Sequence, residues 1–268
     1  MTHEVIISGG TLVDGTGDEA RRADVAIDNG RISRVGDLEG EQAGQTIDAT
    51  DKIVTPGFVD LHTHLDAQIA WDPEMRPSSY HGVTTALIGN CGVSFAPVSA
   101  GKSEYLAKLM EAVEDIAADA IIDGLPWNWE SFGEYLDTVQ TLKPTLNVVG
   151  LAGHSAIRFE AMGDKACDKD VQADEQELAR IVDLVKASVA EGAVGFSTSR
   201  FLGHRVPDGR LTPGTWADPH ETEAIQQAVV DAGGRGGLFQ VAPDMQTRYE
   251  VERAMFERGA EIGCQVLF

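Results

Sequence analysis

Apolar and polar positions alternate in short runs over the first 55 residues, and turn residues separate the runs. These runs are Val5–Ser8, Thr11–Val13, Asp24–Ile27 and Arg31–Gly36. Alternation with a period of two predicts half-buried strands. Asn29-Gly30, between the last two runs, predicts a hairpin turn. Residues 1–55 are therefore expected to form a small antiparallel β unit.

From residue 53 onward, apolar strand-like runs alternate with stretches whose apolar residues recur at helical spacing. Strands are expected at Ile53–Leu61, Thr84–Gly89, Leu146–Leu151, Val194–Ser197, Gly237–Val241 and Gln265–Phe268. Helices are expected at Ser103–Ala118, Asp174–Glu191, Glu221–Ala232 and Thr247–Gly259. This alternation predicts an α/β fold with a parallel sheet. Strands that are apolar except at their C-terminal ends suit a TIM-type barrel with a site on that face.

The number of these runs sets an expectation about the barrel. A (β/α)₈ barrel needs eight strands and typically ~250 residues. Residues 56–268 contain about six strand-like runs against those eight, and the sequence stops within the apolar run Cys264–Phe268. We therefore expect an incomplete barrel in residues 56–268, truncated at its C-terminus.

Composition narrows the function classes. Of the 268 residues, 21 are Lys or Arg and 43 are Asp or Glu, which gives a formal charge of −22. Such a charge repels nucleic acid and anionic membrane surfaces. No apolar run is long enough to span a membrane, and the N-terminus lacks the pattern of a signal peptide. The three cysteines form no paired framework,. We expect a cytoplasmic protein without nucleic-acid or membrane partners.

Two histidines one residue apart follow the first strand-like run of this segment, in Pro56-Gly57-Phe58-Val59-Asp60-Leu61-His62-Thr63-His64. Residues i and i+2 of a strand point to the same side. His62 and His64 can therefore chelate one metal ion or two adjacent ions, and imidazole is the commonest biological metal ligand. A polar strand end without a metal is the alternative, and the pattern favours the metal.

Cys91 occupies the corresponding place after the next run, in Gly89-Asn90-Cys91-Gly92. The C-terminal ends of neighbouring parallel strands meet at one face, and a thiolate there is a good zinc ligand or a bridge between two metals. A single cysteine can also be a small buried apolar residue. Its place at the end of the strand leaves these two interpretations about equally supported.

Five segments together resemble a known family. They are Pro56–His64, Gly82–Thr85, Gly89–Pro97, Gly153–Arg158 and Gly195–Thr198. The chain resembles the N-acyl-D-amino-acid deacylases (D-aminoacylases) of the metal-dependent amidohydrolase superfamily, over the N-terminal half of that family's length. His-x-His is shared by the whole superfamily, whereas Gly-Asn-Cys-Gly is much more specific to this branch.

The resemblance implies a metal-bearing (β/α)₈ barrel flanked by a β-sandwich, which residues 1–55 would begin. It also implies zinc-dependent hydrolysis of the amide of a small N-acyl-D-amino acid, giving a carboxylate and a D-amino acid. By position, Cys91 matches the cysteine at the tightly bound zinc. His62 and His64 match the pair at a second, weaker metal position.

The chain also departs from the family. Gln240 stands where the family has a histidine at the end of the fifth strand, and an amide is a poor zinc ligand beside imidazole. The family's next histidine ligand and its catalytic aspartate are expected beyond Phe268. Cys91 is therefore the one tight-zinc ligand expected in this chain, and the catalytic residue stays unknown.

Other polar residues at the expected strand ends are candidates for substrate contact. His154 and Arg158 could bind a substrate carboxylate, although a hydrogen-bonded structural histidine is an equal alternative. Ser197 could also contact the substrate. Asp66 is expected either to orient a metal ligand or to cap a helix. His204 lies in a loop rich in Gly, Pro and Arg, which we expect to form a lid.

Two further hypotheses compete with deacylation of linear amides. A cyclic-amide hydrolase of the same superfamily commonly uses a lysine after the fourth strand, but Ser197–Arg200 contains none. The other hypothesis is a catalytically silent truncated fragment, or a half-barrel that needs a second chain. An open parallel edge would then favour self-association.

Overall fold

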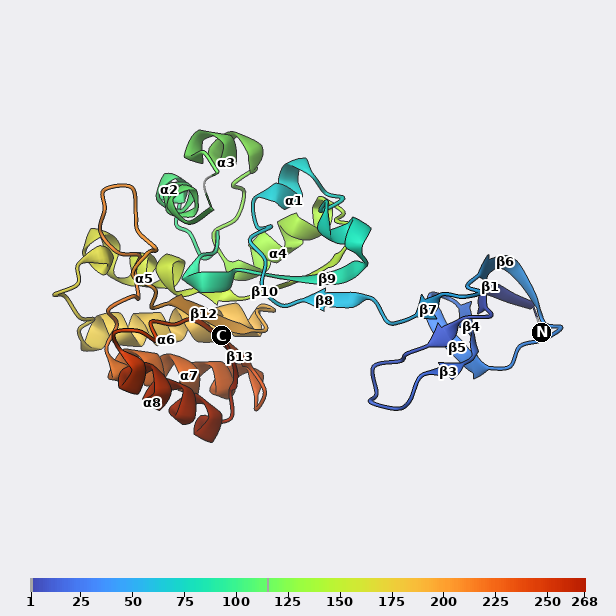
Figure 1. Ribbon diagram of the computed structural model, residues 1–268. Coiled ribbons are helices and arrows are strands. Elements are labelled where there is room, and N and C mark those ends of the chain that lie inside the picture. Colours follow the sequence, from blue (N-terminus) through green and yellow to red (C-terminus); the bar gives the residue numbers. More distant parts are fainter. Residues whose placement is uncertain (1, 115) are drawn as a thin grey trace. The chain divides into compact units, whose positions relative to one another are not determined.

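The computed structural model describes residues 2–114 and 116–268. The chain divides into two compact units, Met1–Phe58 and Val59–Phe268 (Figure 1). The first unit is built from strands, and the second has an α/β architecture, as the sequence predicts. Within the described ranges, none of the helices combines the length and apolar character that a membrane crossing needs.

The first unit contains two small sheets. One has the order β5-β4-β1-β6, and the other has the order β3-β2-β7. The strands are β1 (Thr2–Ser8), β2 (Thr11–Leu12), β3 (Arg21–Arg22), β4 (Asp24–Asp28), β5 (Arg31–Gly36), β6 (Gln42–Asp48) and β7 (Ile53–Val54). Ile6, Ala26 and Leu38 form the buried apolar cluster of this unit.

The hairpin predicted at Asn29-Gly30 is confirmed. β4 and β5 are antiparallel, with Asp28 opposite Arg31. Both turn residues have positive φ, 53° and 69°, as a two-residue type I′ turn requires. The expectation of a wholly antiparallel unit is wrong, because β6 runs parallel to β1 and β7 parallel to β2. β6 was not predicted because its side chains are almost all exposed and show no apolar alternation.

His3 on β1 joins two acidic side chains of this unit. Its Nδ1 lies 2.7 Å from Asp28 Oδ2, and its Nε2 lies 2.9 Å from Glu41 Oε2. The hydrogen bonds to Asp28 and Glu41 raise the pKa of His3 above its ordinary value. The imidazole of His3 thus links β1 to the end of β4 and to the segment before β6.

Parallel strands make up the sheets of the second unit. They are β8 (Phe58–Asp60), β9 (Val83–Ile88), β10 (Asn147–Gly150), β11 (Ala152–Gly153), β12 (Gly195–Ser199), β13 (Leu238–Ala242) and β14 (Gln265–Leu267). The orders are β10-β9-β8 and β11-β12-β13-β14. Leu151 N–H donates to Ile88 O, and Val194 N–H donates to Gly150 O. These bonds place the β10–β11 segment between β9 and β12.

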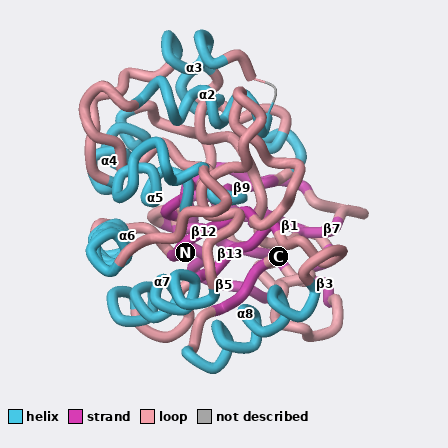
Figure 2. The backbone as a smooth tube through the Cα atoms, turned by 90° about the vertical axis from the view of Figure 1, so that its left-hand side faces the viewer, coloured by secondary structure: helices cyan, strands magenta, loops and turns pink. Residues whose placement is uncertain are grey.

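The helices of the second unit are α1 (Gln68–Trp71), α2 (Ser103–Glu114), α3 (Ala118–Gly124), α4 (Phe132–Thr141), α5 (His154–Met162), α6 (Glu175–Ala190), α7 (Pro219–Gly233) and α8 (Tyr249–Ile262). Single 3₁₀ turns lie at Ser78–His81, Asn90–Gly92 and Gly163–Cys167. Helices α6, α7 and α8 lie side by side along the strands (Figure 2).

The helices predicted at 174–191, 221–232 and 247–259 correspond to α6, α7 and α8. Asp174 is the N-cap of α6, where its carboxylate accepts the N–H groups of Gln176 and Glu177. The helix expected at 103–118 is shorter: α2 ends at Glu114, Asp115 lies outside the described residues, and residues 116–117 are not helical. Helix α5 was not predicted because it is buried on nearly all sides, so no polar face marks its period.

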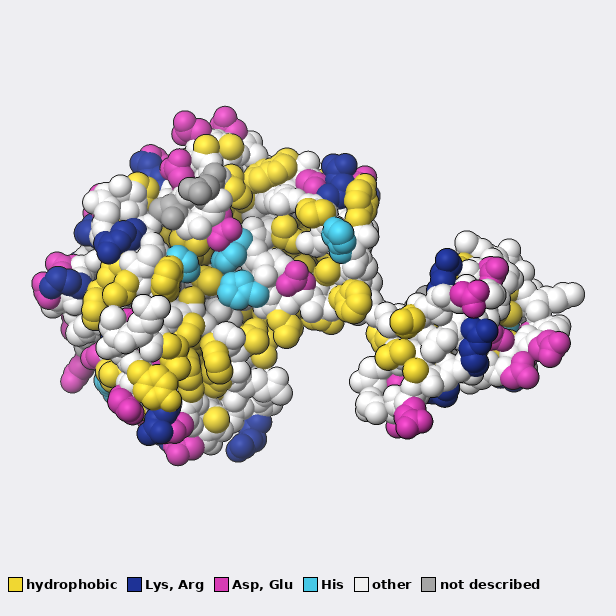
Figure 3. Space-filling model, in the orientation of Figure 1, with side chains coloured by type: hydrophobic (Ala, Val, Ile, Leu, Met, Phe, Trp, Pro, Cys, Tyr) yellow, Lys and Arg dark blue, Asp and Glu magenta, His cyan; other side chains and the backbone are white. Residues whose placement is uncertain are grey.

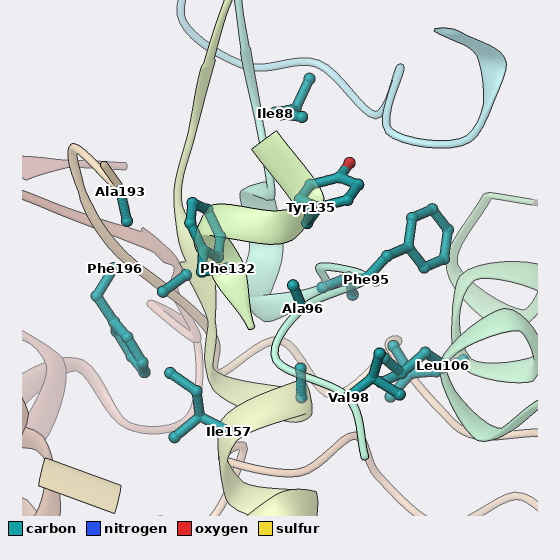
Figure 4. Close-up of a cluster of buried hydrophobic side chains, with 14 of the residues drawn as sticks. Ile88, Phe95, Ala96, Val98, Leu106, Phe132, Tyr135, Ile157, Ala193 and Phe196 are labelled. Atoms are coloured by element: carbon teal, nitrogen blue, oxygen red, sulfur yellow. The ribbon is translucent and has the colours of Figure 1, made fainter. Parts of the chain in front are cut away.

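A large apolar core fills the space between the strands and helices of the second unit. Figure 4 shows Phe132 and Tyr135 of α4 in this cluster, with Phe196 of β12 and Ile157 of α5. All four side chains are almost completely buried. The Ser131–Glu134 capping box begins α4, so a local polar motif positions two of these aromatic rings.

A left-handed turn follows β9 and positions Cys91. Gly89 has φ 77°, and a Cβ atom there would lie 2.2 Å from Leu151 O. Glycine is thus required both by the backbone conformation and by the close approach of the neighbouring strand. Cys91 itself has φ 55°, which is uncommon for a residue other than glycine.

We predict that stability of the first unit falls as pH rises through the raised pKa of His3. When the pKa of a histidine is higher in the folded state than in the unfolded state, its protonation stabilises the folded state. This stabilisation is complete below the pKa of the unfolded state and is lost as the pH rises through the pKa of the folded state. Amide hydrogen exchange of β1 between about pH 6 and about pH 9, corrected for intrinsic rates, measures this loss. The His3→Gln variant should show a flatter profile, and parallel profiles for both proteins would contradict the prediction.

We also predict that Gly89→Ala destabilises the chain by about 2 kcal/mol more than Gly101→Ala. Gly101 has a similar φ of 82°, but nothing lies within 4 Å of its would-be Cβ. The pair therefore separates the clash with Leu151 O from the common backbone strain. Urea unfolding of both variants provides the measurement, and equal midpoints would refute the role assigned to the close approach.

Candidate metal centre

The structure brings His62, His64 and Cys91 together at the C-terminal ends of β8 and β9. One ligand atom from each lies within 4.8 Å of the others. His62 Nε2 is 3.1 Å from Cys91 Sγ, and the rings of His62 and His64 lie 5.4 Å apart between centroids. Histidine side chains gather on this face of the second unit (Figure 3).

Thr63 anchors the segment that carries the two histidines. It is buried, and both its backbone N–H and its hydroxyl donate to Leu87 O on β9, at 3.3 and 2.7 Å. This anchor holds the segment after β8 against β9. β8 ends at Asp60 and residues 61 and 62 form a bend, so the two imidazoles lie close together in a bent segment beyond the strand rather than through strand alternation.

Two buried side chains fix the ends of the turn that holds Cys91. Asp66 Oδ1 accepts the Gly89 N–H at 2.8 Å. Ser197 Oγ accepts the Gly92 N–H at 3.0 Å and donates to Gly89 O. Asp66 therefore supports the turn rather than capping a helix, because the N-cap of α1 is Ala67 and no side chain caps this helix. The Ser197 hydroxyl is buried, and both of its hydrogen bonds are made within this turn. Contact of Ser197 with a substrate stays a prediction.

Gln240 of β13 holds the middle of the same turn. Its Oε1 accepts the Cys91 N–H at 2.8 Å. The side chain is fully buried, and its Nε2 makes no hydrogen bond with the described residues. The residue that departs from the family pattern therefore contacts the backbone of the candidate ligand.

His64 is suited to ligate a cation at neutral pH. Burial, together with the nearby imidazoles of His62 and His204, lowers the pKa of His64 to about 4. The imidazole is therefore neutral, as a metal ligand must be. Its Nδ1 is buried and has no hydrogen-bond partner in the part of the chain that the structure describes. A buried nitrogen without a partner is costly unless a ligand satisfies it.

Cys91 completes a donor set that fits zinc. Burial raises the pKa of its thiol to about 12, with further contributions from Glu114 and Asp66. A divalent cation would favour the thiolate instead. Glu114 also lies beside the cluster, with Oε1 3.4 Å from His64 Nε2. Two imidazoles and one thiolate are ligands that zinc prefers.

His154 and Arg158 lie inside the protein. His154 is fully buried, with Nδ1 2.8 Å from Thr198 Oγ1 and Nε2 2.7 Å from Glu221 Oε1. Arg158 Nε lies 3.1 Å from the same carboxylate oxygen, and its Nη1 donates to Ala166 O at 2.7 Å. This arrangement matches the structural alternative for His154, and substrate contact by either residue stays a prediction.

His204 was assigned to a lid, and its relation to the cluster was missed. Its Nδ1 lies 2.7 Å from Ser199 Oγ at the end of β12. Burial and the neighbouring His62 lower its pKa. A polar residue shortly after a strand is the signal that singled out Cys91. The same signal applies to His204, which follows the C-terminal end of β12 by five residues.

Comparisons with known proteins identify the family of the chain. Residues 45–262 match the amidohydrolase family. The D-aminoacylase of Alcaligenes xylosoxydans xylosoxydans is 32% identical over 263 residues, which cover 98% of this chain and 48% of that protein. A solved D-aminoacylase, described with a binuclear metal centre, matches with a TM-score of 0.77 at 28% identity, over 98% of this chain and 50% of that chain.

A second solved structure is N-acyl-D-glutamate deacylase from Bordetella bronchiseptica, complexed with zinc and a phosphonate inhibitor. It matches with a TM-score of 0.79 at 28% identity, over 99% of this chain and 51% of that chain. The chain spans about half the length of the curated relatives it matches. The resemblance to the N-acyl-D-amino-acid deacylases is thus confirmed, and the chain belongs to the amidohydrolase family.

Proposed function

We propose that this chain carries the metal-binding part of a zinc-dependent hydrolase that cleaves the amide of N-acyl-D-amino acids. The observation that carries the proposal is the convergence of His62, His64 and Cys91 at one end of the sheet. The unpartnered Nδ1 of His64 supports it. The names of the relatives support the substrate class, because they include deacylases of D-amino acids, D-glutamate and D-aspartate.

We further infer that residues 56–268 form part of a (β/α)₈ barrel and that residues 1–55 form part of a β-sandwich. Parallel pairing of β9 with β10 and of β11 to β14 in chain order supports the barrel. The candidate ligands follow the C-terminal ends of strands, where barrel enzymes place their active sites. The two small sheets of the first unit support the sandwich.

His62, His64 and Cys91 would hold the zinc. Bound zinc would supply a Lewis acid that polarises an amide carbonyl and makes water more acidic. The chain's own residues prepare the site for this ion. Burial keeps His64 neutral, and Thr63, between the two histidines, ties their segment to Leu87 O of β9.

Three further side chains hold the turn around Cys91. Asp66, Ser197 and Gln240 fix the backbone at Gly89, Gly92 and Cys91. Cys91 therefore need not reorganise its backbone on binding. A site already arranged for its ligand loses less conformational entropy when the ligand binds.

We predict that the purified chain retains about one zinc ion after dialysis against a weak chelator. Cys91→Ser should weaken zinc binding about 100-fold, because it removes the thiolate while nearly preserving the shape of the side chain. Zinc content and competition with a chromogenic chelator measure the effect. His220→Gln, which changes an exposed histidine on α7, is the matched control. Equal zinc retention by both variants would remove Cys91 from the site.

We predict zinc-dependent release of amino acid from N-acetyl-D-methionine and N-acetyl-D-glutamate by the full chain. The rate should exceed that for the L enantiomers by at least about tenfold, which corresponds to about 1.4 kcal/mol. A coupled assay for free amine measures it, with Cys91→Ser as the inactive control. If the chain holds zinc and hydrolyses none of these substrates, the site binds metal but the proposed hydrolysis is wrong for this chain.

A further inference from the structure

The two ring nitrogens of His64 lie in unlike surroundings. Nε2 faces a carboxylate, since Glu114 Oε1 lies 3.4 Å away. Nδ1 is buried and has no hydrogen-bond partner among residues 2–114 and 116–268. One nitrogen of the ring is therefore next to an anion, and the other is a buried polar atom to which no described residue binds.

The carboxylate determines which nitrogen of His64 carries the hydrogen. A histidine that binds a metal is neutral, so one ring nitrogen carries a hydrogen and the other carries a lone pair. An ionised carboxylate only accepts hydrogen bonds. The hydrogen therefore belongs on Nε2, where Glu114 can accept it. The lone pair of His64 is then on Nδ1.

Glu114 occupies a place that its own helix does not favour. It is the last residue of α2, and the C-terminal end of a helix disfavours a negative charge. No basic residue in the last turn offsets that charge. The side chains of Glu114 and His64 are 27% and 15% exposed, so water and salt screen their contact only in part. The position of this carboxylate is thus explained better by the histidine it faces than by the helix that carries it.

The same carboxylate acts on two other acidic groups of the site. Burial is the main cause that raises the pKa of Cys91 to about 12 and that of Asp66 to about 7, and Glu114 contributes to both increases. Negative charges that lie close together repel one another, and a bound divalent cation reverses that effect. Figure 3 shows acidic side chains that border the histidines on this face. The surroundings of His64 therefore favour a cation.

We propose that Glu114 is a positioning residue that accepts the Nε2–H of His64 and thereby presents Nδ1 of this histidine to the bound cation. The inference rests on the metal site of the proposed function, and it concerns the ion at His64 alone. Metal-binding histidines usually donate their other ring N–H to a carboxylate or a carbonyl group, which fixes the tautomer and the orientation of the ring. Glu114 is this group for His64, and it comes from the end of a helix rather than from a strand.

The experiment compares the wild-type chain with Glu114→Gln and Glu104→Gln, with Zn²⁺ as the probe and a chromogenic chelator as the competitor. Glu114→Gln keeps the size of the side chain, but an amide can also donate a hydrogen bond and so no longer requires the hydrogen on Nε2. This variant should bind Zn²⁺ about 10- to 100-fold more weakly. Glu104→Gln makes the same change in the first turn of α2, at an exposed position, and should match the wild type.

A second measurement detects the tautomer itself, by ¹⁵N NMR of the histidine-labelled chain at neutral pH. The signals of His64 are assigned by their loss in His64→Gln. In the metal-free wild type and in Glu104→Gln, Nε2 should carry the hydrogen, and Zn²⁺ should shift the Nδ1 signal. In metal-free Glu114→Gln, the Nε2–H form should no longer predominate. A merely structural role of Glu114 would leave the tautomer unchanged, and urea unfolding checks that each variant is folded.

The outcomes separate this inference from the proposed function. If the wild-type chain does not bind Zn²⁺, the metal site of the proposed function is wrong, and the inference is wrong with it. If the chain binds Zn²⁺ but the hydrogen is on Nδ1, or if Zn²⁺ shifts the Nε2 signal instead, the metal site stands and the role of Glu114 is wrong. Equal Zn²⁺ affinity of Glu114→Gln and the wild type also overturns the inference. Weaker binding with an unchanged tautomer overturns it as well, because Glu114 then acts through its charge alone.

Discussion

The left-handed turn after β9 is the constraint on which the candidate site depends. Gly89, Cys91 and Gly92 all have positive φ. The two glycines adopt it freely, whereas Cys91 keeps it only where the surroundings enforce it. Hydrogen bonds from outside the turn enforce it here, and they come from Asp66 after β8, Ser197 on β12 and Gln240 on β13. Cys91 therefore meets the two histidines only when several strands are already packed. The fold and the donor set form together.

The C-terminal ends of the strands carry two kinds of buried polar group. One kind is paired: Glu221 binds both His154 and Arg158. The other kind has unpartnered atoms among the described residues, and His64 Nδ1, which can offer a lone pair to a cation, belongs to it. Paired networks stiffen a scaffold. Unpaired buried nitrogen atoms carry an energetic cost that a bound ligand can remove. This contrast separates the supporting part of the face from the part suited to a metal.

Gln240 changes what the fifth strand contributes to the site. An amide can accept a backbone N–H and still fill the space beside Cys91, but it is a weak partner for zinc. The imidazoles of the site then come from a segment outside β13, namely His62 and His64 after β8. Glu114 adds a carboxylate next to His64, which would offset part of the charge of a bound cation. Family membership alone does not decide these details, because a fold can carry different sites.

Local patterns in the sequence were enough to predict the features that depend on a few neighbouring residues. Asn29-Gly30 specified its hairpin, and helical spacing of apolar residues marked α6, α7 and α8. Elements without such patterns were missed: β6 is exposed, and α5 is buried almost all round. Tertiary structure alone decided which distant groups meet. The hydrogen bond from Cys91 to Gln240 spans 149 positions, and that from Gly92 to Ser197 spans 105. Such bonds form only when packing closes the chain between them, and no local preference encodes that closure.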